Sequence, residues 1–448
     1  MTGVSALDAD LHLDATTLDG FLAAQRAAGL MHGSRPICRV LSPLVVTHAV
    51  YRRVRRAAEL VLSAMERLLV RVAVDDRLAA VLGIDASERA LHAIDPGYPR
   101  ALVIARLDMV FLEPSGDDED AFVFLELNAD SPAGIIDQAA VEATLYALAP
   151  VRTALSGYRA VPLAPVRALL DALLETHRAW GGSGLPRIAI VDWGDVDTMA
   201  EQEVLQRAFV AQGTPTVLTT PEALRWDGTR LSVDGTPIDL VYRRLIAREL
   251  RARLDDAHPL LQAVRAGAVC LANPFRSTVA NKKSAFAVLS DPAWAHLFTP
   301  DERAVIEAHI PWTRVLGRGG DDATLCADAT ARRNDLVLKP DEDYGGHGVV
   351  LGWTVGDDEW RTALARGVAD GAVLQRRVPV RRLRFPTFDD GGVRRQDLGF
   401  DLNPFLFRGR VEGGMVRVSE GPLSNVSAGG GVTGLLVVDD ADEAGAHV

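Results

Sequence analysis

The feature that most constrains this chain is an apolar segment that ends in polar side chains. Residues 122–128 have the sequence FVFLELN and a Ser-Pro-Ala-Gly segment follows at 131–134, which predicts a buried strand ending in a turn. Because side chains alternate along a strand, Glu126 and Asn128 are expected to share one face. Their oxygens are hard ligands of the kind that Mg²⁺ prefers. An ordinary strand end with an Asx turn is the alternative interpretation.

A second apolar segment precedes this strand, at residues 101–112, and the loop between the two is rich in Pro, Gly and acidic residues. Two strands joined by a short loop predict an antiparallel hairpin. Counting outward from the middle of the loop places Asp108 opposite Glu126, and Arg106 opposite Asn128.

The hairpin therefore brings two carboxylates together. Asp108 and Glu126 would repel each other across the sheet, so we expect a positive charge between them, with a divalent cation as the simplest candidate. Arg106, on the same face, can bind a phosphate oxygen with two parallel hydrogen bonds. The alternative is a plain surface cluster of charges. We assign Phe122 and Phe124 to the same face, which argues against full exposure.

Two later segments supply groups suited to phosphates. Residues 335–351 (DLVLKPDEDYGGHGVVL) place Lys339 at the end of an apolar strand, just before a loop with three glycines. Glycines let backbone N–H groups approach an anion, and the lysine adds a point charge. The spacing is not that of a Walker A loop, and a glycine-rich hairpin without a ligand is the alternative. Lys282 and Lys283 precede a predicted helix, where an anionic ligand would offset their unfavourable interaction with the helix dipole.

The middle of the chain has the pattern of an α/β unit. Residues 187–218 predict a strand, a helix and a second strand, without a GxGxxG segment after the first strand, so a classical NAD site is not expected. A further strand ends in Arg243 and Arg244. Basic residues at the carboxyl end of a parallel strand suit anionic ligands, although salt bridges to Glu249 would explain them equally well.

Composition excludes several classes of function. A chain of 448 residues with 48% hydrophobic content is expected to form two or three domains. Its formal net charge of −12 argues against nucleic acid or an anionic membrane as the main partner. Cys38, Cys270 and Cys326 lie far apart, which indicates neither a disulfide framework nor a zinc site. Without a signal segment or a membrane-spanning run, a cytoplasmic location is expected.

Taken together, these segments resemble circularly permuted ATP-grasp carboxylate–amine ligases, the branch that includes glutathionylspermidine synthetase. The matching segments are Arg106-x-Asp108, Glu126-Leu-Asn128 with Ser131-Pro-x-Gly134, residues 238–244 (IDLVYRR), residues 281–291 (NKKSAFAVLSD), Val337-Leu-Lys339-Pro340 with Gly345-Gly-His-Gly348, Gln375, Arg417-x-Ser419, and Asn425 with its glycines. In the ordinary ATP-grasp order the E-x-N metal motif comes last, whereas here it precedes the lysines and the glycine loop. No amidase domain accompanies the match, so glutathione and spermidine are not implied as substrates.

The resemblance implies an α/β (α+β) fold, a circularly permuted ATP-grasp fold with a Rossmann-like pre-ATP-grasp domain. The expected divisions are a helical N-terminal region (1–100), a permuted ATP-grasp segment with the metal motif (101–180), the Rossmann-like domain (181–270), ATP-grasp lobes with the lysines and glycine loop (271–438) and a flexible tail (439–448).

The resemblance also implies ATP and two Mg²⁺ ions at one site. The expected metal ligands are Asp108, Glu126 and Asn128. The expected nucleotide-binding residues are Lys282 or Lys283, with Lys283 favoured, and Lys339, Gly345, Gly346, Gly348 and Gln375. The expected catalytic residues, which neutralise developing charge, are Arg106 and Arg417. The expected substrate contacts are Ser131, Arg243 and Asn425. His347 is expected to act as a spacer in the glycine loop rather than as a proton carrier.

The implied activity joins a small-molecule carboxylate to an amine through an acylphosphate, for example in peptide-like natural product synthesis. A catalytically silent nucleotide-binding or scaffold protein and a small-molecule kinase are the alternatives. We expect neither nucleic acid nor membrane partners, and the sequence leaves a homodimer open.

Overall fold

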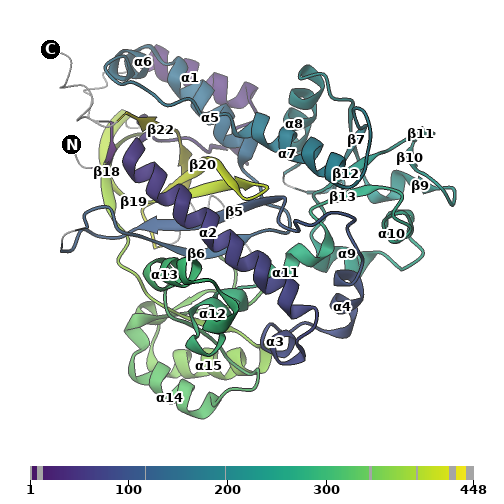
Figure 1. The fold of residues 1–448 in the computed structure, drawn as a ribbon. Coiled ribbons are helices and arrows are strands. Elements are labelled where there is room, and N and C mark those ends of the chain that lie inside the picture. The colour runs from purple at the N-terminus through teal and green to yellow at the C-terminus, as the bar shows by residue number, and fades with distance from the viewer. Residues whose placement is uncertain are drawn as a thin grey trace.

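The computed structural model describes residues 3–7, 14–116, 118–196, 198–342, 346–389, 392–422 and 430–439. Its helices and strands form a mixed α/β fold built around three main sheets (Figure 1). Within the described part of the chain, none of the helices is both long enough and apolar enough to cross a membrane.

The N-terminal region contains the expected helices and also short strands that the sequence analysis did not predict. Its elements are β1 (Val4–Ala6), α1 (Ala15–Ala27), β2 (Met31–His32), β3 (Arg35–Pro36), β4 (Leu44–Thr47), α2 (His48–Val72), α3 (Asp76–Val81) and α4 (Ala86–His92). β4 forms a sheet with β1 and with β22 (Leu435–Val438) from the far end of the chain. Strand partners so distant in sequence leave no local signal, because each strand alone is only three or four residues long.

The long helix α2 packs against the largest sheet and crosses it in Figure 1. Thr47 caps its N-terminus by accepting a hydrogen bond from the Val50 backbone N–H. Buried apolar side chains recur every three or four residues along one face, as at Val54, Val61 and Leu68, which are completely buried. Each such side chain contributes about 1.5–3 kcal/mol by its removal from water.

The largest sheet joins two distant parts of the chain in the order β21-β20-β19-β5-β6, with β18 paired to β19. Its strands are β5 (Ile104–Phe111), β6 (Phe122–Asn128), β18 (Arg382–Asp389), β19 (Gly392–Phe407), β20 (Arg410–Ser419) and β21 (Gly431–Thr433). Because β19 pairs with β5, the predicted hairpin becomes one edge of a sheet whose other strands come from the last quarter of the chain.

The second sheet is parallel, in the order β13-β12-β7-β8, and contains the predicted strand–helix–strand unit. Its strands are β7 (Ile188–Val191), β8 (Thr216–Thr219), β12 (Leu240–Arg243) and β13 (Cys270–Ala272). The helices of this part are α5 (Ile135–Ala147), α6 (Ala149–Leu155), α7 (Pro165–Ala179), α8 (Met199–Ala211), α9 (Ala247–Arg253) and α10 (Pro259–Arg265). A small antiparallel sheet adds β9 (Leu224–Trp226), β10 (Leu231–Val233) and β11 (Thr236–Pro237).

The third sheet has the order β14-β17-β15-β16 and lies with its helices at the bottom of Figure 1. Its strands are β14 (Thr313–Val315), β15 (Leu336–Lys339), β16 (Val350–Leu351) and β17 (Val373–Arg376). Its helices, with those that lead into it, are α11 (Thr278–Asn281), α12 (Ser284–Ser290), α13 (Pro300–His309), α14 (Asp322–Ala331) and α15 (Asp357–Asp370). The loop from β15 to β16 carries the predicted glycines.

Candidate functional site

The predicted register of the β5–β6 hairpin is confirmed at the site. Arg106 pairs with Asn128, and Asp108 pairs with Glu126. The register then shifts, because the residue after Asp108 pairs with Phe124 instead of residue 125. β6 therefore holds one extra residue, which is a β-bulge.

The bulge at Leu125 reverses the alternation of side chains along β6, because one extra residue moves all that precede it to the opposite face. Phe122 and Phe124 belong to the same buried cluster as Leu127, beneath α2. The expectation that these two rings share a face with Glu126 was therefore wrong. The open face instead carries Leu125 and the polar residues that line the cavities described below.

Asp108 lies at the centre of a buried network and is only 6% exposed. Its carboxylate accepts hydrogen bonds from Arg106 Nε at 2.9 Å, Asn128 Nδ2 at 2.9 Å and Arg417 Nη2 at 2.7 Å. Burial alone would raise the pKa of Asp108, but the Arg106 and Arg417 guanidinium groups outweigh burial and lower this pKa to about 2. Asp401 accepts from the same Arg417, with Nη2 at 2.8 Å from its Oδ2.

These contacts change the argument for a metal between the two carboxylates. Guanidinium groups balance the charge of Asp108, and Lys283 Nζ lies 3.5 Å from Glu126 Oε2. Charge balance therefore does not require a divalent cation, contrary to the expectation from the sequence. In the described ranges, no three His, Cys, Asp or Glu side chains come close enough together to hold a metal ion.

Mg²⁺ that arrives with phosphates needs fewer protein ligands, because it is commonly bound by one or two carboxylates plus phosphate oxygens. The Glu126 carboxylate and the Asn128 amide line the same cavity, so their oxygens suit such an ion. Asp108 does not suit it in this arrangement, since both of its oxygens accept hydrogen bonds from guanidinium groups.

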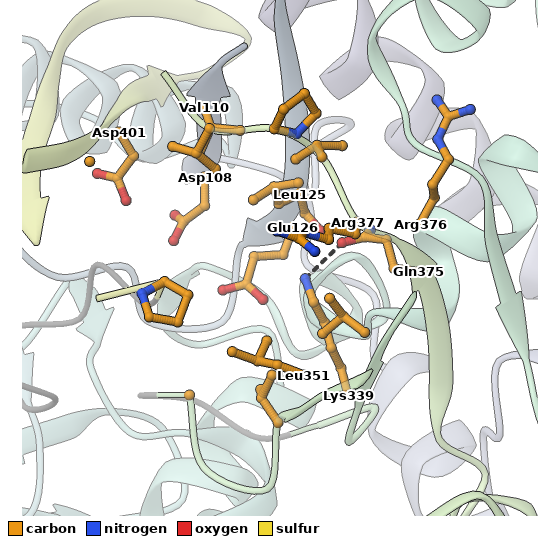
Figure 2. Close-up of a pocket in the computed structure, with 18 of the residues that line it drawn as sticks. Asp108, Val110, Leu125, Glu126, Lys339, Leu351, Gln375, Arg376, Arg377 and Asp401 are labelled. Carbon is orange, nitrogen blue, oxygen red and sulfur yellow. Dashed lines mark hydrogen bonds between the residues drawn. The ribbon is translucent and has the colours of Figure 1, made fainter. Parts of the chain in front are cut away.

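Lys339 is held at the end of β15 by β17. Its Nζ donates to Gln375 Oε1 at 2.7 Å, and Gln375 Nε2 donates to the Leu125 carbonyl at 3.3 Å, so the bulge residue supplies an acceptor for this chain of contacts. Burial lowers the pKa of Lys339. Figure 2 shows the Lys339–Gln375 contact facing the same open space as the carboxylates of Asp108 and Glu126.

Two cavities meet at this network. The first, of about 580 Å³, contains four of the predicted nucleotide-binding residues, namely Lys283, Lys339, Gly346 and Gln375. The second, of about 650 Å³, contains four other predicted residues, namely Arg106, Asn128, Ser131 and Lys282. Asp108, Glu126 and Arg417 line both cavities and so form a shared wall. The second cavity also follows the carboxyl ends of β7 and β12, where open α/β sheets bind ligands.

The two adjacent lysines line different cavities. Lys283 lines the first cavity, whereas Lys282 lines the second and is ion-paired with Glu88 at 3.2 Å and with Glu342. This arrangement agrees with the preference for Lys283 on the nucleotide side. Glu88 comes from α4, a part of the chain in which the sequence offered no motif.

Arg243 does not fit the expectation of a substrate contact. Its side chain is 0% exposed, is ion-paired with Asp130 at 2.5 Å and lies outside the lining of both cavities. The next residue, Arg244, lines the second cavity and donates to the Pro132 carbonyl at 2.6 Å. Because alternate residues of a strand face opposite sides, the choice of Arg243 rather than Arg244 could not be decided from the sequence.

The remaining predicted residues lie in loops. Gly348 has φ +69°, and a Cβ there would lie 2.7 Å from Pro340 Cγ, so the turn requires glycine. Gly345 and Asn425 lie outside the described residues. His347 lines the first cavity.

Asp401 is a site residue that the sequence analysis missed. It holds Arg417 and accepts from Asn403 Nδ2 at 2.6 Å. The signal was present, because an acidic residue and an amide alternate in the apolar segment LGFDLNPF, as Glu126 and Asn128 do in β6.

This chain resembles a solved structure in its fold and matches two curated proteins over part of its sequence. No protein-family model matches the chain. A glutathione synthetase-like effector from Globodera pallida superposes with a TM-score of 0.62 over 95% of this chain and 98% of that one, at 13% identity. At that identity the likeness establishes the fold alone. The chain thus has a mixed α/β fold like that of this effector, which confirms the α/β part of the expected fold class, whereas the circular permutation and the domain divisions stay predictions.

Two curated proteins match in sequence. The chain is 26% identical over 290 residues to "Putative glutamate--cysteine ligase 2-2" of Frankia casuarinae, covering 62% of this chain and 31% of that protein. It is 31% identical over 199 residues to "Putative glutamate--cysteine ligase 2-3" of Frankia alni, covering 42% of this chain and 22% of that protein. The matches thus span less than a third of the relatives' own length.

Proposed function

We propose that this chain is an ATP-dependent ligase that joins a carboxylate to an amine and releases ADP and phosphate. The observation that carries the proposal is the wall shared by the two cavities, formed by Asp108, Glu126 and Arg417. A phosphoryl group transferred from a nucleotide in the first cavity to an acid in the second would have to pass this wall. The two curated relatives carry the name "Putative glutamate--cysteine ligase", which agrees with amide bond formation.

The first cavity has the cations that a nucleotide triphosphate requires. The ammonium groups of Lys283 and Lys339 would contact phosphate oxygens, and Gln375 would hold Lys339 in place. The glycine loop would close over the phosphates with its backbone N–H groups. Burial lowers the pKa of Lys339, so an anionic ligand would help to keep this lysine protonated.

Glu126 and Asn128 would hold Mg²⁺ that enters with the phosphates, and the ion would neutralise phosphate charge. Asp108 would serve chiefly to orient Arg106 and Arg417, since both of its oxygens already accept from them. For Asp108 to become a metal ligand, as the sequence suggested, one of these contacts would have to be given up.

The chemistry then follows from the charges at the wall. The carboxylate of an acid in the second cavity attacks the γ-phosphorus, the bond to the β-phosphate oxygen breaks, and ADP leaves. An amine then attacks the acyl carbon, loses a proton and displaces phosphate. Arg106 and Arg417 face this region and would stabilise the negative charge on the transferring phosphoryl group and on the tetrahedral intermediate.

The strand order supports the permuted arrangement. β5 and β6, which carry the E-x-N segment at residues 126–128, complete a sheet built mainly from residues 382–433. In an unpermuted chain these strands would follow the rest of that sheet in sequence.

The deciding experiment measures ADP release from ATP and Mg²⁺ with a panel of amino acids and other acids, using hydroxylamine as the nucleophile. Acid-dependent ADP together with a hydroxamate product is the expected result. ADP with a stable phosphorylated product would instead indicate a kinase, and failure to bind ATP in calorimetry would indicate a scaffold. Glu126→Gln is expected to lose this ADP release, and Glu203→Gln, an exposed change on α8, is its matched control.

A further inference from the structure

The charged side chains of the second cavity are almost all paired within the protein. Seven Arg and Lys residues line this cavity, and six of them have a carboxylate partner within 4 Å. The paired residues are Arg106, Arg244, Arg251, Arg253, Lys282 and Arg417. Their charges are therefore largely balanced before any ligand enters.

Arg248 is the seventh, and it differs from the others. It is the second residue of α9, its side chain is exposed, and within the described part of the chain no ion pair or hydrogen bond of its guanidinium is found. A guanidinium has five N–H donors and no acceptor, and it stays charged at any physiological pH. Arg248 is thus suited to bind an anionic group of a ligand in the second cavity.

The next residue, Glu249, also lines the cavity and also lacks a partner among the described residues. Neighbouring positions on a helix point about 100° apart and do not face each other, so Glu249 does not neutralise Arg248. An anion at Arg248 would be weakly repelled by Glu249. Arg248 is therefore expected to increase the affinity for the anion, and Glu249 to decrease it.

Arg248 also lies away from the reacting end of the cavity. Unlike Asp108, Glu126 and Arg417, which line both cavities, Arg248 lines the second cavity and not the first. A group bound at Arg248 is therefore distinct from the carboxylate that would be activated at the shared wall.

We infer that the acid held in this cavity carries a second anionic group, a carboxylate or a phosphate, and that Arg248 binds it. The assignment of the first carboxylate rests on the proposed function, whereas binding at Arg248 does not. Arg248 is accordingly a specificity-determining residue that favours dianionic over monoanionic acids.

The test compares three acids of equal chain length, namely pentanoate, glutarate and 4-phosphonobutyrate, at pH 8. Their dissociation constants for the full chain are measured by ligand-observed NMR titration. We expect glutarate or 4-phosphonobutyrate to bind about ten-fold more tightly than pentanoate, which corresponds to about 1.4 kcal/mol. The tighter of the two identifies the second group as a carboxylate or a phosphate.

Two variants test whether Arg248 causes the preference for the dianion. Arg248→Gln is expected to remove the preference for the dianion and leave pentanoate binding unchanged, whereas Glu249→Gln is expected to keep or increase the preference. Equal binding of all three acids, binding of none, or an unchanged preference in Arg248→Gln would overturn the inference. Hydroxamate formation is recorded with the same acids, so that loss of ligase activity with an intact Arg248-dependent preference refutes the proposed function alone.

Discussion

Replacing Asp108 with Asn removes the one charge that two buried guanidinium groups share. The Arg106 and Arg417 side chains are 12% and 11% exposed, so bulk water cannot replace the hydrogen bonds that Asp108 accepts from them. The lowering of the Asp108 pKa from 3.8 to about 2 corresponds to about 2 kcal/mol of stability at pH 7. Removing one partner of a buried ion pair typically costs about 3–5 kcal/mol. We therefore expect Asp108→Asn to lower the free energy of unfolding by about 2–4 kcal/mol.

The pH dependence has a definite sign. A carboxyl whose pKa is lower in the folded state contributes its full stability above the unfolded pKa of 3.8, and loses it as the pH falls through about 2. About half of the contribution at pH 7 should remain at pH 3. The advantage of the wild type over Asp108→Asn should shrink accordingly.

Urea unfolding at pH 7 and pH 3, followed by circular dichroism, measures the difference between the two proteins. Asp171→Asn is the control, because Asp171 is exposed and, among the described residues, pairs with Arg167 one helical turn away. That pair should be worth less than about 0.5 kcal/mol. A difference between Asp108→Asn and the wild type below about 1 kcal/mol at pH 7, or one that does not change with pH, would refute the reasoning.

Two further predictions concern the site, and a third concerns a buried carboxyl group of α5. Glu126→Gln should lower kcat at least about 100-fold with an unchanged unfolding midpoint, and full activity in this variant would exclude the metal assignment. Lys283→Met should raise the KM for ATP about ten-fold, whereas Lys282→Met should leave it unchanged because Lys282 lines the other cavity; equal effects in steady-state kinetics would contradict this division. Burial and the nearby Glu201 raise the pKa of Asp137 to about 7, so this group destabilises the fold increasingly as the pH rises from about 4 to 7. Asp137→Asn should therefore raise the thermal midpoint at pH 8 and not at pH 4, and a pH-independent change would count against it.

The sequence by itself determined the parts of the site that depend on neighbours in the chain. The loop between two apolar segments set the register that pairs Asp108 with Glu126, because a hairpin of given loop length has few alternatives. The strand–helix–strand pattern predicted the parallel pairing of β7 and β8. The end of an apolar strand predicted the position of Lys339, which does line a cavity with Lys283.

Only the tertiary structure decided which side chains share a face or a partner. One extra residue, Leu125, moved two phenylalanines to the opposite face of β6, and the apolar pattern is unchanged by such a bulge. Arg417, 309 residues from Asp108 in sequence, turned out to be one of the positive charges that the hairpin requires. Ion pairs depend on distance in space, whereas the sequence supplies only distance along the chain. The positive charge that the hairpin was expected to need is therefore present in guanidinium and ammonium groups of the protein itself, and the metal ligands stay a prediction.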